Sequence, residues 1–242
     1  MLKTSSKRTP LAFALLAAGV LGALTVAFGA LPVARSIQFS DNFSSGTLDR
    51  WQFPYPEDWV VQSEGSLHFL HMLHSREPLV PRRPMQFALL KGVNVGSFTF
   101  QARVRREGSS LLIVFNYVDT LHFYYTHLSV DPGAKVDVHN GLFIVDGGPR
   151  RRIAGVEASP VLPDKDWHKI RVQRDVPSGS IEVFVDADPS PRFSVVDHTF
   201  NCGQVGMGSF DETGDFTDVR LTSGDASCQP GTGVTLRPAS TR

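Results

Sequence analysis

Alternation with a period of two residues is the feature that most restricts how this chain can fold. Apolar side chains occupy every second position in several segments, among them 98–104, 111–117 and 181–185. Successive side chains of a strand point to opposite faces of a sheet, so this pattern is typical of strands with one face buried. Beyond residue 36 no long stretch shows the 3.6-residue rhythm of a helix. We therefore predict an all-β protein.

Clusters of turn-forming residues separate the alternating segments. They include Glu107–Ser110, Pro177–Gly179 and Asp211–Gly214. Asn140–Gly141 lies between two further candidate strands, and this dipeptide favours a two-residue hairpin turn. Many short strands at such spacing are typical of a sandwich or a barrel.

The N-terminal segment carries the marks of export. Lys3, Lys7 and Arg8 precede an apolar run, Leu11–Leu31, whose only polar side chain is that of Thr25. This is the pattern of a secretory signal or of an uncleaved signal anchor helix, and the sequence leaves both open. We expect the protein outside the cytoplasm, either secreted or periplasmic, or anchored to the membrane.

Three regions follow from these patterns. Residues 1–36 are the signal peptide or anchor, residues 37–228 form one β-sandwich domain, and residues 229–242 form a Gly-, Pro-, Thr- and Ser-rich tail that we expect to be disordered. Without residues 1–36 the chain has 20 basic and 24 acidic residues. A mildly acidic domain is a poor nucleic-acid binder, so we expect no nucleic-acid partner.

Basic residues nevertheless cluster at three places. These are Arg82–Arg83, Arg105–Arg106 and Arg150–Arg152. Solvated loops and contacts with an anionic glycan both account for such clusters.

A series of motifs resembles the concanavalin A-like lectin and glucanase superfamily. In chain order the motifs are Phe39-Ser-Asp-Asn-Phe43, Leu48-Asp-Arg-Trp51, Gly65-Ser-Leu67, Gly96-Ser-Phe-Thr-Phe-Gln-Ala-Arg103, Asp166-Trp-His-Lys-Ile-Arg171, Gly179-Ser-Ile-Glu-Val-Phe-Val-Asp186 and Phe216-Thr-Asp-Val-Arg220. The resemblance covers about residues 39–222 and implies a jelly-roll β-sandwich. Similar domains include laminin G-like binding modules, laminarinase-type glycosidases and the 3-keto-disaccharide hydrolase-like domain, so the fold implies no single function.

Four polar or aromatic residues lie on central strands according to this resemblance. They are Arg103, Asn116, His122 and Tyr124. A flat ring beside a few hydrogen-bonding groups suits a sugar, so we predict a carbohydrate site with Tyr124 as its stacking surface. The alternative is a sheet face that packs against a loop.

No catalytic motif is recognisable. The Glu-x-Asp-x-x-Glu strand of laminarinase-type enzymes is absent, and Glu182 and Asp186 share a face only within a strand motif general to the fold. We therefore predict an exported, monomeric binding module for carbohydrate or another cell-envelope ligand. A glycosidase of the 3-keto-disaccharide hydrolase type is the alternative, and whether the protein is an enzyme stays open.

The resemblance also suggests a structural calcium ion. In similar domains the first and last strands lie side by side, and acidic residues from both hold an ion, here Asp41 and Asp218. The alternative is that both are turn or edge acids.

The two cysteines, Cys202 and Cys228, are expected to form a disulfide, because export permits one. Segments 203–210 and 215–222 are predicted to pair as a hairpin, which places Cys202 opposite Ser223. The segment from Gly224 to Ser227 is small enough to curl back and close the bridge.

Overall fold

A computed structural model of the chain describes residues 36–131, 139–155, 160–224 and 228. The predicted export segment and the tail 229–242 lie outside these residues and stay predictions. No helix within the described ranges is long and apolar enough to cross a membrane.

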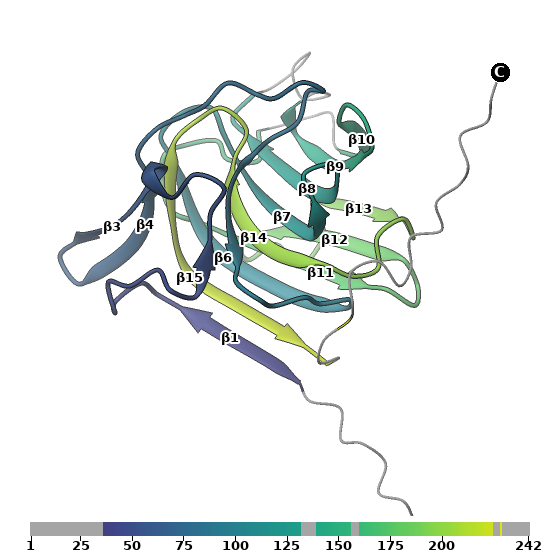
Figure 1. Ribbon diagram of the computed structural model, residues 1–242, viewed down its shortest axis with the longest axis horizontal. Helices are drawn as coiled ribbons and strands as arrows, with labels where there is room; N and C mark the ends of the chain where they lie inside the picture. The colour runs from purple at the N-terminus through teal and green to yellow at the C-terminus, as the bar shows by residue number, and fades with distance from the viewer. Residues whose placement is uncertain (1–35, 132–138, 156–159, 225–227, 229–242) are drawn as a thin grey trace, which may run out of the picture. The chain divides into compact units, whose positions relative to one another are not determined.

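Two antiparallel sheets make up the described part of the chain (Figure 1). Sheet 1 has the order β13-β12-β11-β6-β15-β4-β3, and β1 also pairs with β15. Its strands are β1 (Ile37–Asp41), β3 (Trp59–Glu64), β4 (Leu67–Met72), β6 (Phe98–Arg106), β11 (His168–Asp175), β12 (Ser180–Val185), β13 (Phe193–Val196) and β15 (Gly214–Ser223).

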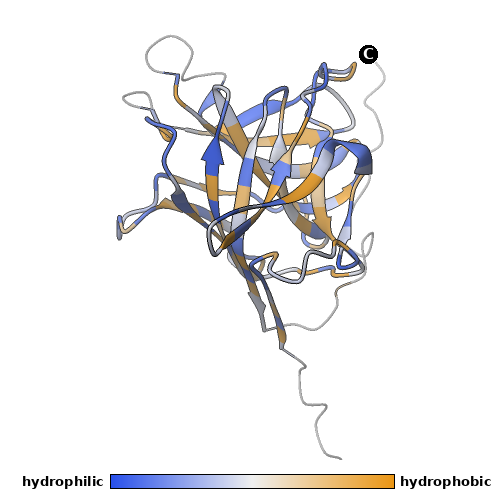
Figure 2. Cartoon of the chain, turned by 90° about the vertical axis from the view of Figure 1, so that its left-hand side faces the viewer, coloured by the Kyte–Doolittle hydropathy of each residue, from blue (hydrophilic) through white to orange (hydrophobic). Residues whose placement is uncertain are grey.

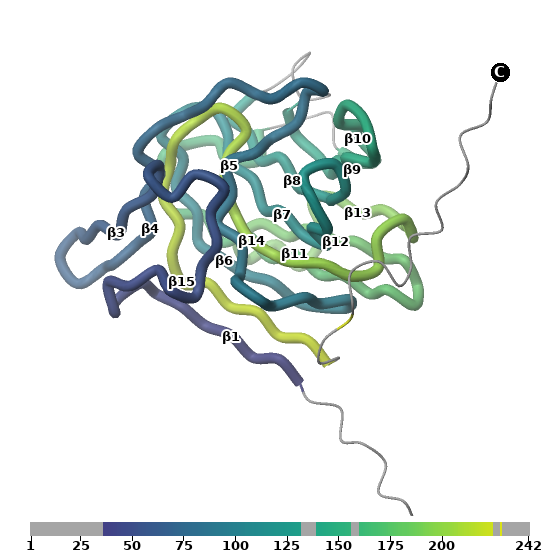
Figure 3. Tube along the Cα trace, in the orientation of Figure 1, coloured from purple at the N-terminus to yellow at the C-terminus, as the bar shows by residue number. Residues whose placement is uncertain are grey.

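Sheet 2 has the order β10-β9-β8-β7-β14-β5-β2. Its strands are β2 (Trp51–Gln52), β5 (Gln86–Leu90), β7 (Ser110–Asp119), β8 (His122–Ser129), β9 (Gly141–Asp146), β10 (Arg151–Ala154) and β14 (Gln204–Ser209). The tube in Figure 3 shows β5 and β14 following neighbouring paths in this sheet. The only helix among the described elements is a single 3-10 turn, η1 (Pro56–Asp58). The predicted all-β sandwich is confirmed.

The main core lies between the sheets and follows the predicted alternation. In β6 the side chains of Phe98, Phe100, Ala102 and Val104 are at most 5% exposed and join this core. The residues between them, from Thr99 to Arg105, are partly exposed on the outer face of sheet 1. Figure 2 shows the same alternation of polar and apolar positions along the strands. Burial of one face of each strand supplies the driving force that holds the layers together.

Sheet 2 is apolar on both faces. A second cluster of buried residues covers its outer face and consists of Phe87, Leu89, Leu112, Val114, Phe123, Tyr125, Phe143, Val145 and Phe210. The connection from β4 to β5 reaches across to this side, because the Arg83 Nε–H donates to the Thr120 carbonyl at 2.7 Å. The amide of Arg150 donates to the Arg82 carbonyl at 3.0 Å. This face of sheet 2 is therefore closed by protein.

A bulge in β7 changes the face on which one aromatic residue lies. Asn116 has φ +44°, and the pairing of β7 with β8 shifts between Phe115 and Asp119. The sequence alternation places Tyr117 with Leu111, but Tyr117 instead packs on Phe87 and Phe123 in the outer cluster. One inserted residue reverses every later side chain of a strand, and an L-residue in a left-handed conformation leaves no clear mark in the sequence.

The predicted hairpin of 203–210 with 215–222 is wrong. β14 pairs with β5 and β7 in sheet 2, whereas β15 pairs with β6, β4 and β1 in sheet 1. The two strands face each other across the core, and the turn at Asp211–Gly214 joins the layers. The first strand of the hairpin predicted at Asn140–Gly141 falls largely on residues 132–138, which lie outside the described ranges. The strand after the turn is β9, and it pairs with β8 and β10.

The predicted disulfide is confirmed. Cys202 and Cys228 are bonded, with their Cα atoms 5.7 Å apart. Cys202 lies just before β14 and the end of β15 is five residues before Cys228, so the bridge joins segments that belong to different sheets.

Candidate functional site

The structure places Tyr124 in the core, away from any surface. Its side chain is 0% exposed, and its ring stacks on Phe115 with the centroids 5.6 Å apart. The hydroxyl donates to the Asp197 carboxylate and accepts the amide N–H of Phe200 at 3.0 Å. Burial, together with the bond to Asp197, raises the pKa of Tyr124. The ring therefore offers no free face on which a sugar could stack.

The other three predicted ligand residues do not gather around Tyr124. Asn116 is fully buried at the β7 bulge, and its Nδ2 donates to the Val95 carbonyl at 3.0 Å. His122, which is 28% exposed, contacts Asp119 through Nδ1 at 2.8 Å. Arg103 lies on the outer face of sheet 1, where it pairs with Asp218 at 3.3 Å. The strands are central as the resemblance indicates, but Arg103 lies on sheet 1 and points outward, whereas Tyr124 lies on sheet 2 and points into the core.

Asp41 and Asp218 line one hollow of about 400 Å³, because β1 and β15 are paired as expected. Asp41 already accepts the Phe43 amide at 2.8 Å and the Trp51 indole N–H at 2.9 Å. The lining also includes the cationic side chains Arg50 and Arg220.

Calcium takes six to eight oxygen ligands, and this donor set does not fit it well. No group of three or more His, Cys, Asp or Glu side chains is placed to hold a metal in the ranges that the structure describes. The calcium site stays an untested prediction.

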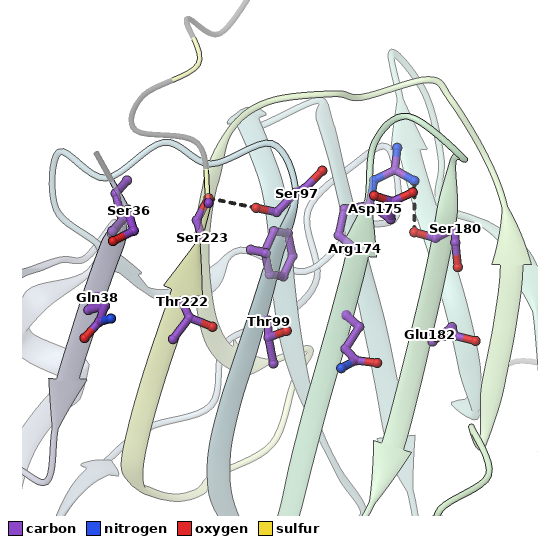
Figure 4. A pocket seen from close by; sticks show the side chains of 14 residues that line it. Ser36, Gln38, Ser97, Thr99, Arg174, Asp175, Ser180, Glu182, Thr222 and Ser223 are labelled. Atoms are coloured by element: carbon purple, nitrogen blue, oxygen red, sulfur yellow. Dashed lines mark hydrogen bonds between the residues drawn. The ribbon is translucent and has the colours of Figure 1, made fainter. Parts of the chain in front are cut away.

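A shallow polar groove of about 530 Å³ crosses the outer face of sheet 1 (Figure 4). The groove lies at the end of sheet 1 where β1 and β12 begin and β11 and β15 end. Ser97, Asp175 and Ser223 form its rim. Its floor is a line of polar side chains that we call the polar row: Gln38, Thr222, Thr99, Gln173 and Glu182. Each of these side chains points outward, and an adjacent residue of the same strand points inward and packs in or against the core.

The register of five strands brings the polar row into line. Gln38 is paired with Thr222, Thr222 with Thr99, Thr99 with Gln173, and Gln173 with Glu182. Figure 4 shows the labelled members from β1, β15, β6 and β12 projecting toward the same side. Neighbouring strands are about 4.8 Å apart, so the row extends for roughly 19 Å across the sheet.

The polar row has hydrogen-bonding capacity to spare. Within the described part of the chain, none of its side chains hydrogen-bonds to another residue, whereas at the rim the Ser223 hydroxyl donates to the Ser97 carbonyl at 2.8 Å. Arg174 lines the groove but directs its guanidinium at backbone carbonyls, those of Gly179 and Phe200. The charged groups left in the groove are the carboxylates of Asp175 and Glu182. These would repel an anion, so the groove is suited to a polar ligand without negative charge.

Asp175 is poorly placed for acid catalysis. Its carboxylate accepts the hydroxyl and the amide N–H of Ser178, and these bonds lower its pKa. A general acid in glycoside hydrolysis needs a raised pKa so that it carries a proton near neutral pH.

The sequence does not single out the polar row. Each member is one more polar residue in an alternating strand, and the strands that carry Gln38 and Glu182 are far apart in the chain. Only the lateral register, which local patterns do not encode, brings them together.

No protein-family model and no curated protein matches this sequence. Solved structures do match the fold. The chain superposes on the carbohydrate-binding module CBM66 from Bacillus subtilis with TM-score 0.51 and 16% identity, over 72% of this chain and 96% of that one. The winged bean acidic lectin gives 0.51 and 10%, over 78% and 98%. The GH43 protein BlXynB from Bacillus licheniformis gives 0.55 and 13%, over 76% and 39%. At these identities the matches show the fold, a lectin-like β-sandwich.

Proposed function

We propose that this protein is an exported carbohydrate-binding module and that the groove on sheet 1 is its ligand site. The observation that carries the proposal is the polar row, a line of amide, hydroxyl and carboxylate groups without partners among the described residues. Sugar hydroxyls donate and accept hydrogen bonds, and so do glutamine amides and threonine hydroxyls. The groove is open along its length, which suits an extended oligosaccharide lying across the strands.

The comparisons support this class of ligand. CBM66 is named as a carbohydrate-binding module, and the winged bean lectin was solved with methyl-α-D-galactose. Export is supported by the disulfide, because disulfides persist mainly in oxidising compartments outside the cytoplasm. The apolar run Leu11–Leu31 then serves as the signal or the anchor.

A glycan array followed by calorimetry on the best neutral oligosaccharide tests the proposal. Gln173→Ala removes a central amide of the polar row, and we expect it to weaken binding at least tenfold, with the melting temperature unchanged. Gln101→Ala is the matched control, because Gln101 also faces outward from sheet 1 but does not line the groove. Equal affinity of both variants, or no binding to any glycan, would refute the proposal.

The same oligosaccharide decides between binding and catalysis. Incubation with the protein is expected to release no new reducing ends, because Asp175 is held in its ionised form. Measurable hydrolysis that is lost in Glu182→Gln would make the protein a glycosidase instead.

A further inference from the structure

The groove on sheet 1 is long across the strands and narrow along them. Its lining takes a short stretch from each of five strands and the residues next to their ends, and no stretch is longer than three residues. The next outward positions on β15, β6 and β11 are Arg220, Gln101 and Arg171, and none of them belongs to the lining. Two residues of a strand span about 7 Å, whereas five strands span roughly 19 Å from the first to the last. The groove is therefore about as wide as one sugar ring and several times longer.

One outward side chain per strand follows this length. Gln38 comes from β1 and Glu182 from β12, and the register places the other three members of the polar row between them, one on each strand (Figure 4). Every member has an amide, hydroxyl or carboxylate group that forms hydrogen bonds with a sugar hydroxyl. The hydrogen-bonding groups thus repeat at the strand spacing, which is about 4.8 Å.

A ligand that uses the whole row needs hydroxyl groups with the same repeat. In an extended glycan such as the chain of cellulose, both glycosidic bonds of a unit are equatorial, and each unit advances the chain by nearly one strand spacing. The chain of amylose is built from the same sugar, but it coils and advances much less per unit. Neighbouring strands are rotated by about 20°, and rotation about the glycosidic bonds lets an extended chain follow that twist.

The charges in the groove restrict the ligand to neutral units. Glu182 is the only charged member of the polar row, and Asp175 lies on the rim nearby. The guanidinium of Arg174 is directed at backbone carbonyls and does not offset these carboxylates at the surface. A chain of uronic acids would place its own carboxylates against them, and like charges repel.

We propose that the groove binds a neutral glycan as an extended, ribbon-like chain, with one sugar unit on each of the five strands. This inference rests on the proposed function and narrows its ligand to chains of the cellulose, xylan or chitin type. An extended chain also loses less conformational entropy on binding than a coiled chain that must first be unwound.

Calorimetry with oligosaccharides of two to six units tests the inference. The probes are the cello-, xylo- and N-acetylated chito-oligosaccharides, and the malto-oligosaccharides are the control, because cello and malto chains contain the same sugar and differ only in linkage. We expect the affinity of the best extended series to rise at least tenfold from two units to five and then to level off. The malto-oligosaccharide of five units should bind at least tenfold more weakly.

A variant at both ends of the polar row tests how many units are bound. Gln38→Ala combined with Glu182→Ala removes the first and the last contact and leaves the three central strands unchanged. The affinity should then level off at three units, and the affinity for the three-unit chain should stay within twofold of wild type. Gln101→Ala is the matched control, because Gln101 faces outward from β6 but does not line the groove. It should leave the dependence on chain length unchanged.

Three results would overturn the inference. They are a malto-oligosaccharide that binds as tightly as the best extended chain, an affinity that stops rising at two units, and a levelling-off that stays at five units in the end variant. If no extended series binds but the glycan array yields another neutral ligand that depends on Gln173, the inference fails and the proposed function stands. Absence of binding to any glycan would remove both.

Discussion

Removing one oxygen atom from Tyr124 tests the placement of this ring in the core. In Tyr124→Phe the aromatic contacts stay, but two hydrogen bonds are lost, one to Asp197 and one from the Phe200 amide. The Phe200 side chain is 1% exposed, so its amide N–H is left without a partner in a buried place. A buried donor without a partner costs about 1–3 kcal/mol, and we take about 2 kcal/mol as the expected loss of unfolding free energy.

That loss can be measured. For a domain of about 190 residues, 2 kcal/mol corresponds to a fall in melting temperature of about 4–8 °C. Urea unfolding should give the same difference without a change in the slope. Tyr55→Phe is the matched control, because Tyr55 is partly exposed and its hydroxyl has no hydrogen-bond partner among the described residues. We expect this control to lie within about 0.5 kcal/mol of wild type.

The effect should also depend on pH. Burial raises the pKa of Asp197, but the bonds from Tyr124 and Thr199 outweigh it, so the net pKa lies below the usual 3.8. A lowered pKa contributes stability at higher pH that is lost as the pH falls through the folded-state value. The gap between wild type and Tyr124→Phe should therefore shrink below pH 4. A variant as stable as wild type, or one that loses glycan binding at unchanged stability, would refute the core assignment.

Three further predictions concern stability. Reduction of the disulfide should lower the unfolding free energy by at most about 3.5 kcal/mol, because it opens a loop of 26 residues, and two thiols should alkylate only after reduction. Burial lowers the pKa of His168, but bonds to Asp186 and Asp164 outweigh this and raise it above 6.5. Stability should thus fall as pH rises through that raised value, and His168→Gln should flatten the profile measured by urea unfolding. If Asp41 and Asp218 hold calcium, calcium added after chelation raises the melting temperature and Asp218→Asn abolishes the rise. A melting temperature that calcium leaves unchanged would contradict the prediction.

Local patterns predict what is local in this fold. The alternation of Phe98 to Val104 correctly gives the buried and exposed faces of β6, because the side-chain period of a strand is fixed by the backbone. The disulfide was also predictable, although the hairpin of 203–210 with 215–222 that supported the prediction is wrong. β14 and β15 are both apolar toward the core, and alternation does not tell whether two successive strands pair or face each other across it.

The candidate sites depend on which sheet each strand joins and on the lateral register of the strands, and local sequence patterns do not encode either. Tyr124 and Arg103 both lie on central strands, yet one points into the core from sheet 2 and the other outward from sheet 1. The polar row needs the lateral register of strands from both ends of the chain. The bond from the Arg150 amide to the Arg82 carbonyl likewise joins the β4–β5 connection to the segment before β10, which lies far away in the chain.

The two outer faces of the sandwich differ in what they offer a polar ligand. The outer face of sheet 2 is filled by apolar side chains. The outer face of sheet 1 is polar throughout the row from Gln38 to Glu182, and its groove has no outward-facing cation in the part of the chain that is described. A neutral saccharide therefore finds a continuous line of hydrogen-bonding groups on sheet 1. If the groove is the site, binding should fall with substitutions in the polar row and not with Gln101→Ala, because Gln101 shares the outer face of sheet 1 but lies outside the groove.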